Sequence, residues 1–205
     1  MTADVYPQPS RPPGPARSPL SRHGRAPLSG RVLAGAAGPL LLGLCAVLVA
    51  GERAYRFHEM AGAQWLVSHA LGLRTLLLEA PDAPVLYAGD ASGLGRGIAL
   101  TTGCSSALLI APLALLAGLL LLFGSRRPSR VLLGFVLAAA LVVAANLGRL
   151  TLIVAMQHRY GEEGFGWTHV LFGSVLMMAS GLVALLLFLL LITRTSTRDA
   201  EADAP

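Results

Sequence analysis

The sequence predicts an all-α membrane protein: a four-helix transmembrane bundle with an extracytoplasmic amphipathic helix and a short hairpin. Composition is the first observation behind this prediction. Of 205 residues, 54% are hydrophobic and 13% are charged, whereas soluble domains average about 25% charged residues. The other two observations are four apolar runs of membrane-spanning length and an uneven distribution of arginines between them. Together they exclude a soluble enzyme as the first interpretation, and also a disordered chain, a coiled coil and a disulfide scaffold.

The four apolar runs define the domain organisation, because a membrane-spanning helix needs about 20 mostly apolar residues. We expect spans at about residues 32–50, 104–123, 131–156 and 169–192. They form a predicted catalytic transmembrane domain of residues 32–192. Residues 1–31 are rich in proline and arginine and are predicted to be a disordered cytoplasmic tail; residues 193–205 form a second cytoplasmic tail. A cleavable signal peptide ending near Ala50 is the alternative for the first run, although its 19 residues exceed the usual length of about 7–15.

Arginine positions predict the orientation in the membrane. All sixteen basic residues are arginines, and basic residues concentrate in cytoplasmic segments. With the N-terminus in the cytoplasm, ten arginines fall on the cytoplasmic side, five fall in the longer outer segments, and Arg149 lies within a span. We therefore expect a multi-pass protein of the cell membrane with both termini in the cytoplasm. The net charge of +5 is explained by this topology, so we expect no nucleic-acid partner.

The largest predicted outer segment is the loop of residues 51–103, which we expect to form a cap. Apolar residues recur at helical spacing over Met60–Leu78, which predicts an amphipathic helix at the outer membrane interface. Pro81 ends this pattern. Two short strands, Val85–Ala88 and Gly97–Thr101, are then predicted around a turn rich in glycine.

Three chemically active side chains are predicted near the outer ends of different spans: Cys104, Arg149 and His169. Ionisable residues inside a membrane are functional by default, and no predicted span contains a carboxylate that could neutralise Arg149. Asn146, one helical turn earlier, can hold the guanidinium but not neutralise it. Taken singly, Cys104 has the alternative of a small packing residue, an interpretation that suits Cys45. His169 has the alternative of a residue in the headgroup region.

Acyl transfer is the chemistry that these three groups support together. A cysteine thiolate attacks a carbonyl carbon, and a nearby base accepts the thiol proton and later returns it to a leaving amine. A cation stabilises the tetrahedral oxyanion. Cys104 at the start of a helix and facing Arg149 would be favoured as the thiolate. His169, also predicted at a helix start, would be favoured as the neutral imidazole.

At these residues the sequence resembles the exosortase/archaeosortase family of membrane proteins, which are proposed to be sortase-like cysteine transpeptidases. The resemblance extends over roughly residues 53–192 and rests on the order of three motifs. These are Cys104-Ser105-Ser106, Asn146-Leu147-Gly148-Arg149, and His169 with Gly173 one turn later. The chain departs from the family where Ser106 replaces a frequent glycine, and its predicted spans are fewer than in many members.

The resemblance implies a function and a set of partners. The chain would cleave a C-terminal sorting signal of exported proteins, made of a short motif, an apolar helix and a basic tail, and would transfer the acyl group from Cys104 to an acceptor amine, for example on a lipid. His169 would be the acid/base, and Arg149 would hold the oxyanion or the thiolate. Asn146, Ser105 and Gly173 would support the site or bind substrate.

Two other functions are weighed against this one. The chain could be a non-enzymatic multipass membrane protein, an assembly partner or a subunit that binds an anionic lipid or ligand through Arg149. A thiol-redox enzyme is disfavoured because there is no Cys-x-x-Cys motif.

No cofactor or metal is predicted, because the outer histidines lack the spacing of metal ligands. The outer acids are interpreted as ordinary solvated loop residues, with binding of a basic substrate segment as the alternative: Glu59, Glu79, Asp82, Asp90, Glu162 and Glu163.

Overall fold

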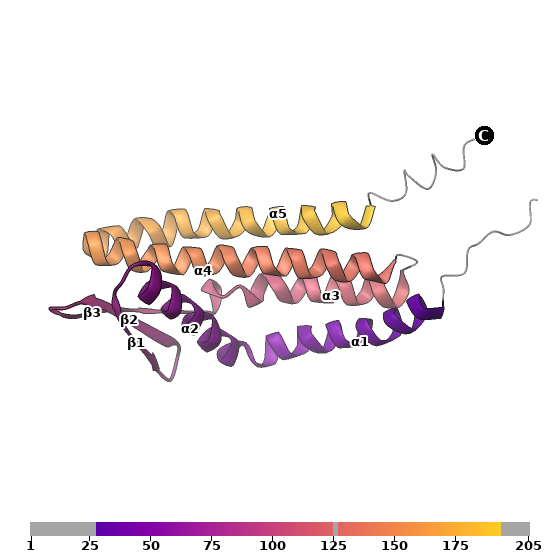
Figure 1. The fold of residues 1–205 in the computed structure, drawn as a ribbon, viewed down its shortest axis with the longest axis horizontal. Coiled ribbons are helices and arrows are strands. Elements are labelled where there is room, and N and C mark those ends of the chain that lie inside the picture. The colour runs from indigo at the N-terminus through magenta and orange to yellow at the C-terminus, as the bar shows by residue number, and fades with distance from the viewer. Residues whose placement is uncertain (1–27, 125–126, 194–205) are drawn as a thin grey trace, which may run out of the picture.

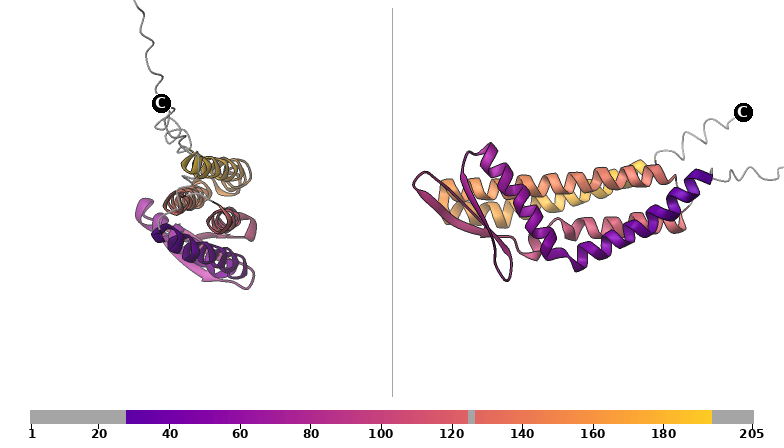
Figure 2. Two further views of the ribbon diagram at one scale, coloured as in Figure 1. Left: turned by 90° about the vertical axis from the view of Figure 1, so that its right-hand side faces the viewer. Right: turned by 60° about the horizontal axis from the view of Figure 1, so that its bottom comes forward.

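The computed structural model describes residues 28–124 and 127–193, which are mostly helical. Four long helices run along the long axis of the molecule (Figure 1): α1 (Leu28–Ala50), α3 (Ala107–Phe123), α4 (Pro128–Gly166) and α5 (Gly173–Thr193). They pack in the order α1, α3, α4, α5. Helix α2 (Glu52–Ala70) and a small sheet lie at one end of this array, here called the sheet end (Figures 1 and 2).

Small residues bring the long helices close together. A Cβ atom on Gly38 of α1 would lie 2.8 Å from the side chain of Leu122, and one on Gly118 of α3 would lie 2.9 Å from that of Leu42. Glycines at such close helix contacts are typical of helices that pack within a membrane. The outward faces are apolar as well, since large side chains such as Leu40 and Met178 are more than 70% exposed.

One stretch in the described part of the chain, Pro128–Thr193, has the length and apolar composition of a membrane span. It reverses direction at Gly161, whose φ of 66° and ψ of −142° interrupt the helix. Helices α4 and α5 therefore lie side by side and antiparallel (Figure 1). Helices α1 and α2 pass the same test only as a pair bent by 85°, and α3 is a shorter apolar helix.

The sheet was only partly predicted. Strands β1 (Arg74–Glu79), β2 (Pro84–Asp90) and β3 (Gly93–Ala99) form an antiparallel sheet in the order β1-β2-β3. The prediction of a helix over Met60–Leu78 is wrong at both ends, because α2 begins at Glu52 and stops at Ala70. Gly72 ends it with a φ of 67°, a conformation that glycine adopts at little cost, and the following residues then pair with β2.

The turn between β2 and β3 is closed by a local contact. The backbone N–H and the hydroxyl of Ser92 both donate to the carboxylate of Asp90. These hydrogen bonds lower the pKa of the fully exposed Asp90 below its ordinary value. Asp90 is therefore a solvated turn residue, as the sequence predicted.

An apolar core, separate from the one among the long helices, joins the sheet to α2 and α4. Leu86 of β2 and Ile98 of β3 pack with the buried stripe of α2 and with the part of α4 that follows Arg149. The half-buried Cys104 packs against the same cluster. This core therefore fixes the position of the segment between β3 and α3.

Two predicted helix starts differ from the structure. Cys104 lies in a short 3-10 helix, Thr102–Cys104, three residues before α3 begins. His169 lies in a π-helical turn, Trp167–Phe172, about two turns after the break at Gly161. Neither residue begins an α-helix, so the expected influence of a helix N-terminus on the thiol and on the imidazole is wrong. Residues 1–27 and 194–205, which hold most of the two predicted tails, lie outside the described residues.

Candidate active site

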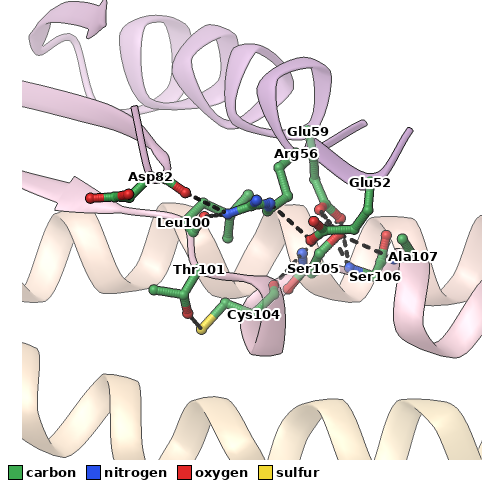
Figure 3. Close-up of polar contacts among 11 residues, drawn as sticks. Glu52, Arg56, Glu59, Asp82, Leu100, Thr101, Cys104, Ser105, Ser106 and Ala107 are labelled. Atoms are coloured by element: carbon green, nitrogen blue, oxygen red, sulfur yellow. Dashed lines mark hydrogen bonds and ion pairs between the residues drawn. The ribbon is translucent and has the colours of Figure 1, made fainter. Parts of the chain in front are cut away.

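Cys104 is held in a turn between the sheet and α3, here called the cysteine turn (residues 101–106). Leu100 anchors the start of this turn because its side chain is fully buried and its N–H donates to the carbonyl of Pro84 at 3.0 Å. The N–H of Cys104 donates to the carbonyl of Thr101 at 3.0 Å, and the Thr101 hydroxyl lies 3.5 Å from the cysteine Sγ. Figure 3 shows the Sγ atom on the opposite side of the turn from Glu59.

The thiol of Cys104 faces the imidazole of His169. Its Sγ atom lies 3.9 Å from Nε2, within hydrogen-bond distance for sulfur. The imidazole ring stacks on Phe165, with ring centroids 5.1 Å apart. Its buried Nδ1 atom finds no hydrogen-bond partner among the described residues. The ring is therefore held by packing and directs Nε2 at the thiol.

Arg149 is buried beside the same site. It is 4% exposed and makes no hydrogen bond or ion pair with any residue described in the structure. A Cβ atom on Gly173 would lie 3.2 Å from the Arg149 Nε, so the glycine leaves the space that the guanidinium stem occupies. The positive charge of Arg149 also acts on the imidazole of His169.

The predicted site residues therefore meet at the sheet end of the long helices, although not all touch. Cys104 and His169 are in direct contact, and Arg149 lies against Gly173 and near His169. The structure records no contact between Arg149 and Cys104 within the described residues.

Glu59 is the polar residue of this region that the sequence interpretation missed. It is 6% exposed, not solvated. Its carboxylate accepts hydrogen bonds from the Ser105 hydroxyl at 3.0 Å, the Ser106 N–H at 3.1 Å and the Asn146 side-chain amide at 2.7 Å. The interpretation of Glu59 as a loop residue is therefore wrong. Glu59 lies about one helical turn before Ala63, which is on the buried stripe of α2. A predicted helix that began before residue 60 would therefore have placed Glu59 on the same buried stripe.

Asn146 has a different partner from the one expected. Its Nδ2 atom donates to Glu59 and also to the backbone carbonyl of Cys104 at 3.1 Å, and it makes no hydrogen bond to Arg149. Ser105 likewise faces inward, since its hydroxyl donates to Glu59 and accepts the N–H of Ala107 at 3.3 Å. Both side chains hold the cysteine turn in place.

A buried arginine secures the strand that leads into the cysteine turn. Arg56 of α2 is 6% exposed and pairs with Glu52 at 2.8 Å. Its guanidinium also donates to the carbonyl of Leu100 at 3.0 Å (Figure 3). Helix α2 therefore supports both ends of the turn, through Arg56 and through Glu59.

Two cavities flank this region. An apolar groove of about 450 Å³ runs between α1 and α3, and Glu52 and Thr102 line its polar end. A cavity of about 500 Å³ lies between the sheet and the far end of α4, with His158 and Arg96 in its wall. Within the ranges that the structure describes, no three histidine, cysteine or acidic side chains are grouped to hold a metal ion.

Comparison with known proteins gives one match. The family model described as transmembrane exosortase matches residues 31–189, which are 159 of the 205 residues of the chain. No curated protein matches. No solved structure matches.

Proposed function

The chain belongs to the transmembrane exosortase family, and on that basis we propose that it is a membrane-embedded cysteine transpeptidase. It cleaves a C-terminal sorting signal of exported proteins and transfers the acyl group to an acceptor amine. The observation that carries this proposal is the 3.9 Å approach of the Cys104 Sγ to the His169 Nε2 beside the buried guanidinium of Arg149. A thiol, a base and an unpaired cation are the groups that acyl transfer through a thioester requires.

In the first half of the reaction, the Nε2 atom of His169 accepts the thiol proton as Sγ attacks the carbonyl carbon of the scissile bond. The carbonyl π electrons move to oxygen and form a tetrahedral oxyanion. When the oxyanion collapses, the carbon–nitrogen bond breaks, and the leaving amine takes the proton from His169. The cleaved C-terminal sorting signal departs, and the rest of the substrate remains on Cys104 as a thioester.

In the second half, the acceptor amine attacks the thioester carbonyl. His169 accepts a proton from the amine and returns one to the departing Cys104 sulfur, which restores the free enzyme. Attack by water in place of the amine would give hydrolysis by the same steps.

Arg149 is assigned to the oxyanion. A buried cation without a partner is costly to maintain in a membrane protein. The guanidinium is therefore available to an anionic oxygen that forms beside it during the reaction, where a preorganised donor is most effective. Its planar guanidinium presents several N–H donors in a fixed arrangement, so it can direct more than one of them at this oxygen.

The proposed topology has four spans, α1, α3, α4 and α5, with the sheet end outside the cell. Two observations support it. The long helices run along a common direction (Figures 1 and 2) and carry apolar outward faces. Arg127 and Arg130 lie at the connection between α3 and α4, at the end opposite the sheet, which the positive-inside rule assigns to the cytoplasm. The candidate site is then extracytoplasmic and both termini are cytoplasmic.

The apolar groove between α1 and α3 supports a substrate with an apolar helix. The groove is lined by side chains of both helices and ends at Thr102, two residues from Cys104. An apolar helix lying there would deliver the segment that precedes it to the cysteine turn, and a basic tail would follow on the cytoplasmic side.

The proposal is tested by co-expressing the chain with an exported protein that ends in an apolar helix and a basic tail. We expect Cys104→Ala to abolish processing at an unchanged level of membrane protein. The matched control is Cys45→Ala, which removes the other free cysteine and is expected to leave processing intact. Processing that continues in Cys104→Ala would instead favour a non-enzymatic protein that binds an anionic lipid or ligand through Arg149, which has no partner among the described residues.

A further inference from the structure

Glu59 is a buried carboxylate that contacts the cysteine turn, and the proposed mechanism does not use it. We propose that Glu59 is a positioning residue, whose carboxylate fastens the cysteine turn to α4 and thereby holds the Cys104 thiol against His169. The inference deepens the proposed function, and its catalytic part rests on that function. Its structural part rests only on the contacts that Glu59 makes.

The contacts of Glu59 join three elements. The residue comes from α2; the Ser105 hydroxyl and the Ser106 N–H come from the cysteine turn; and the Asn146 amide comes from α4. Asn146 then closes a ring, because the same Nδ2 atom donates to the carbonyl of Cys104. Glu59 therefore ties the two residues that follow Cys104 to α4 through Asn146, which itself holds the Cys104 carbonyl.

The donor and acceptor pattern requires a carboxylate at this position. All three partners of Glu59 are donors, and an ionised carboxylate is the side chain that accepts without donating. Hydrogen bonds to a charged acceptor are about twice as strong as neutral ones. Glutamine would present an NH₂ group to at least one of these donors, and a buried donor left without an acceptor destabilises its surroundings.

The same tie reaches the other groups of the candidate site. Asn146 and Arg149 are three residues apart on α4 and therefore lie on one face of the helix. Fixing Cys104 to Asn146 also fixes it relative to Arg149. A second contact, between the Tyr55 and Ser106 hydroxyls at 2.8 Å, links α2 to the turn without Glu59, so the turn is expected to loosen rather than unfold when Glu59 is changed.

Cys104 reactivity tests this inference without any substrate. In a Cys45→Ala background, Cys104 is the one remaining cysteine of the chain, and its rate of alkylation by N-ethylmaleimide is measured in membranes at neutral pH. We expect Glu59→Gln to slow alkylation at least about fivefold, because the thiol no longer faces the imidazole. His169→Ala is expected to slow it similarly. The double variant is expected to be no more than about twofold slower than the slower single variant, because interacting residues are not additive.

A matched control distinguishes positioning from general stability. Glu79→Gln removes the same charge from an acid of β1 that pairs with Arg53 and makes no hydrogen bond to the cysteine turn in the described structure. It is expected to leave the alkylation rate within about twofold of the parent, since it preserves the contacts of Glu59. If Glu59→Gln fails to reach the membrane, Ser105→Ala removes a single donor and is expected to slow alkylation at least about twofold.

The outcomes separate the inference from the proposed function. A Glu59→Gln alkylation rate equal to the parent rate would overturn the inference. A double variant whose alkylation is slowed by the product of the two single-variant factors, Glu59→Gln and His169→Ala, would overturn it too. Where Ser105→Ala replaces Glu59→Gln, an unchanged alkylation rate in Ser105→Ala has the same consequence. These results carry no information on substrate processing. Conversely, coupled alkylation rates in a chain that processes no substrate would uphold the positioning role of Glu59 and count against the transpeptidase.

Discussion

The Sγ atom of Cys104 and the Nε2 atom of His169 lie 3.9 Å apart, although the two residues are separated by 65 positions in the chain. The thiol is placed by a turn that is hydrogen-bonded to α2 and α4, and the imidazole is placed by stacking on Phe165. Both sets of contacts are made among the described residues. The proposed transpeptidase would use this pair for proton transfer, and the following predictions start from that proposal.

Replacing His169 by alanine removes the proposed acid/base and leaves the thiol in place. General acid–base catalysis contributes about 10²- to 10⁴-fold to rate, so we expect substrate processing to fall by that factor at an unchanged protein level. His69→Ala is the control, because this exposed imidazole stacks on Trp65, away from the candidate site. A His169→Ala rate above about one tenth of wild type would contradict the assigned role.

Gly173→Ala tests the position of Arg149 without changing its charge. The added Cβ would lie 2.9 Å from the carbonyl of Thr168 and 3.2 Å from the Arg149 Nε, so the guanidinium must shift. Small displacements of catalytic groups cost up to about 10²-fold, and we expect kcat/KM to fall at least about tenfold. Gly148→Ala is the matched control in α4, where a Cβ meets no atom within 4 Å. Equal kcat/KM values for the two variants would count against a requirement for the observed Arg149 position.

Arg149→Met separates activity from stability. Removing a cation that stabilises an oxyanion is expected to lower kcat by about 10²- to 10³-fold. Because Arg149 is buried and unpaired in the described structure, its replacement by an apolar side chain is expected to maintain or raise Tm. Arg149→Lys is expected to lose most activity too, since it keeps the charge but not the planar fork. A large drop in Tm for Arg149→Met would show that Arg149 has a structural role.

A photo-crosslinking amino acid in the groove between α1 and α3 locates the substrate helix. Leu108 lines this groove and is 52% exposed, whereas Leu182 of α5 is 59% exposed on another face. We expect crosslinks to the apolar helix of the substrate from position 108 and not from position 182. Crosslinks that form equally from both positions would contradict the groove as the binding site.

The grouping of the candidate site residues could be predicted from the sequence for a simple reason. The rise of an α-helix fixes the depth of each residue along its predicted span, and the sequence places Cys104, Arg149 and His169 near the same end of the predicted helices. The exosortase resemblance drawn from these motifs is confirmed by the family match over residues 31–189. Contact distances were beyond prediction, because depth does not determine which faces of neighbouring helices meet.

The errors arose where local pattern and tertiary packing disagree. Leucines over residues 71–78 fit helical spacing, but Gly72 ends the helix and pairing with β2 makes the rest a strand. Placing the start of α2 at residue 60 also hid Glu59, whose burial depends on a helix that begins at Glu52. Asn146 was assigned to Arg149 by its spacing on one helix, whereas its partners come from other elements.

Trapping of an acyl-enzyme tests the transpeptidase most directly. Membranes containing the chain and an epitope-tagged substrate are incubated without acceptor amine, and covalent adducts are separated under denaturing, non-reducing conditions. We expect an adduct of the processed substrate with the wild-type chain and with Cys45→Ala, which hydroxylamine releases and which is absent from Cys104→Ala. Substrate processing by Cys104→Ala at the wild-type rate, with no hydroxylamine-sensitive adduct in any variant, would contradict a transpeptidase that acts through Cys104.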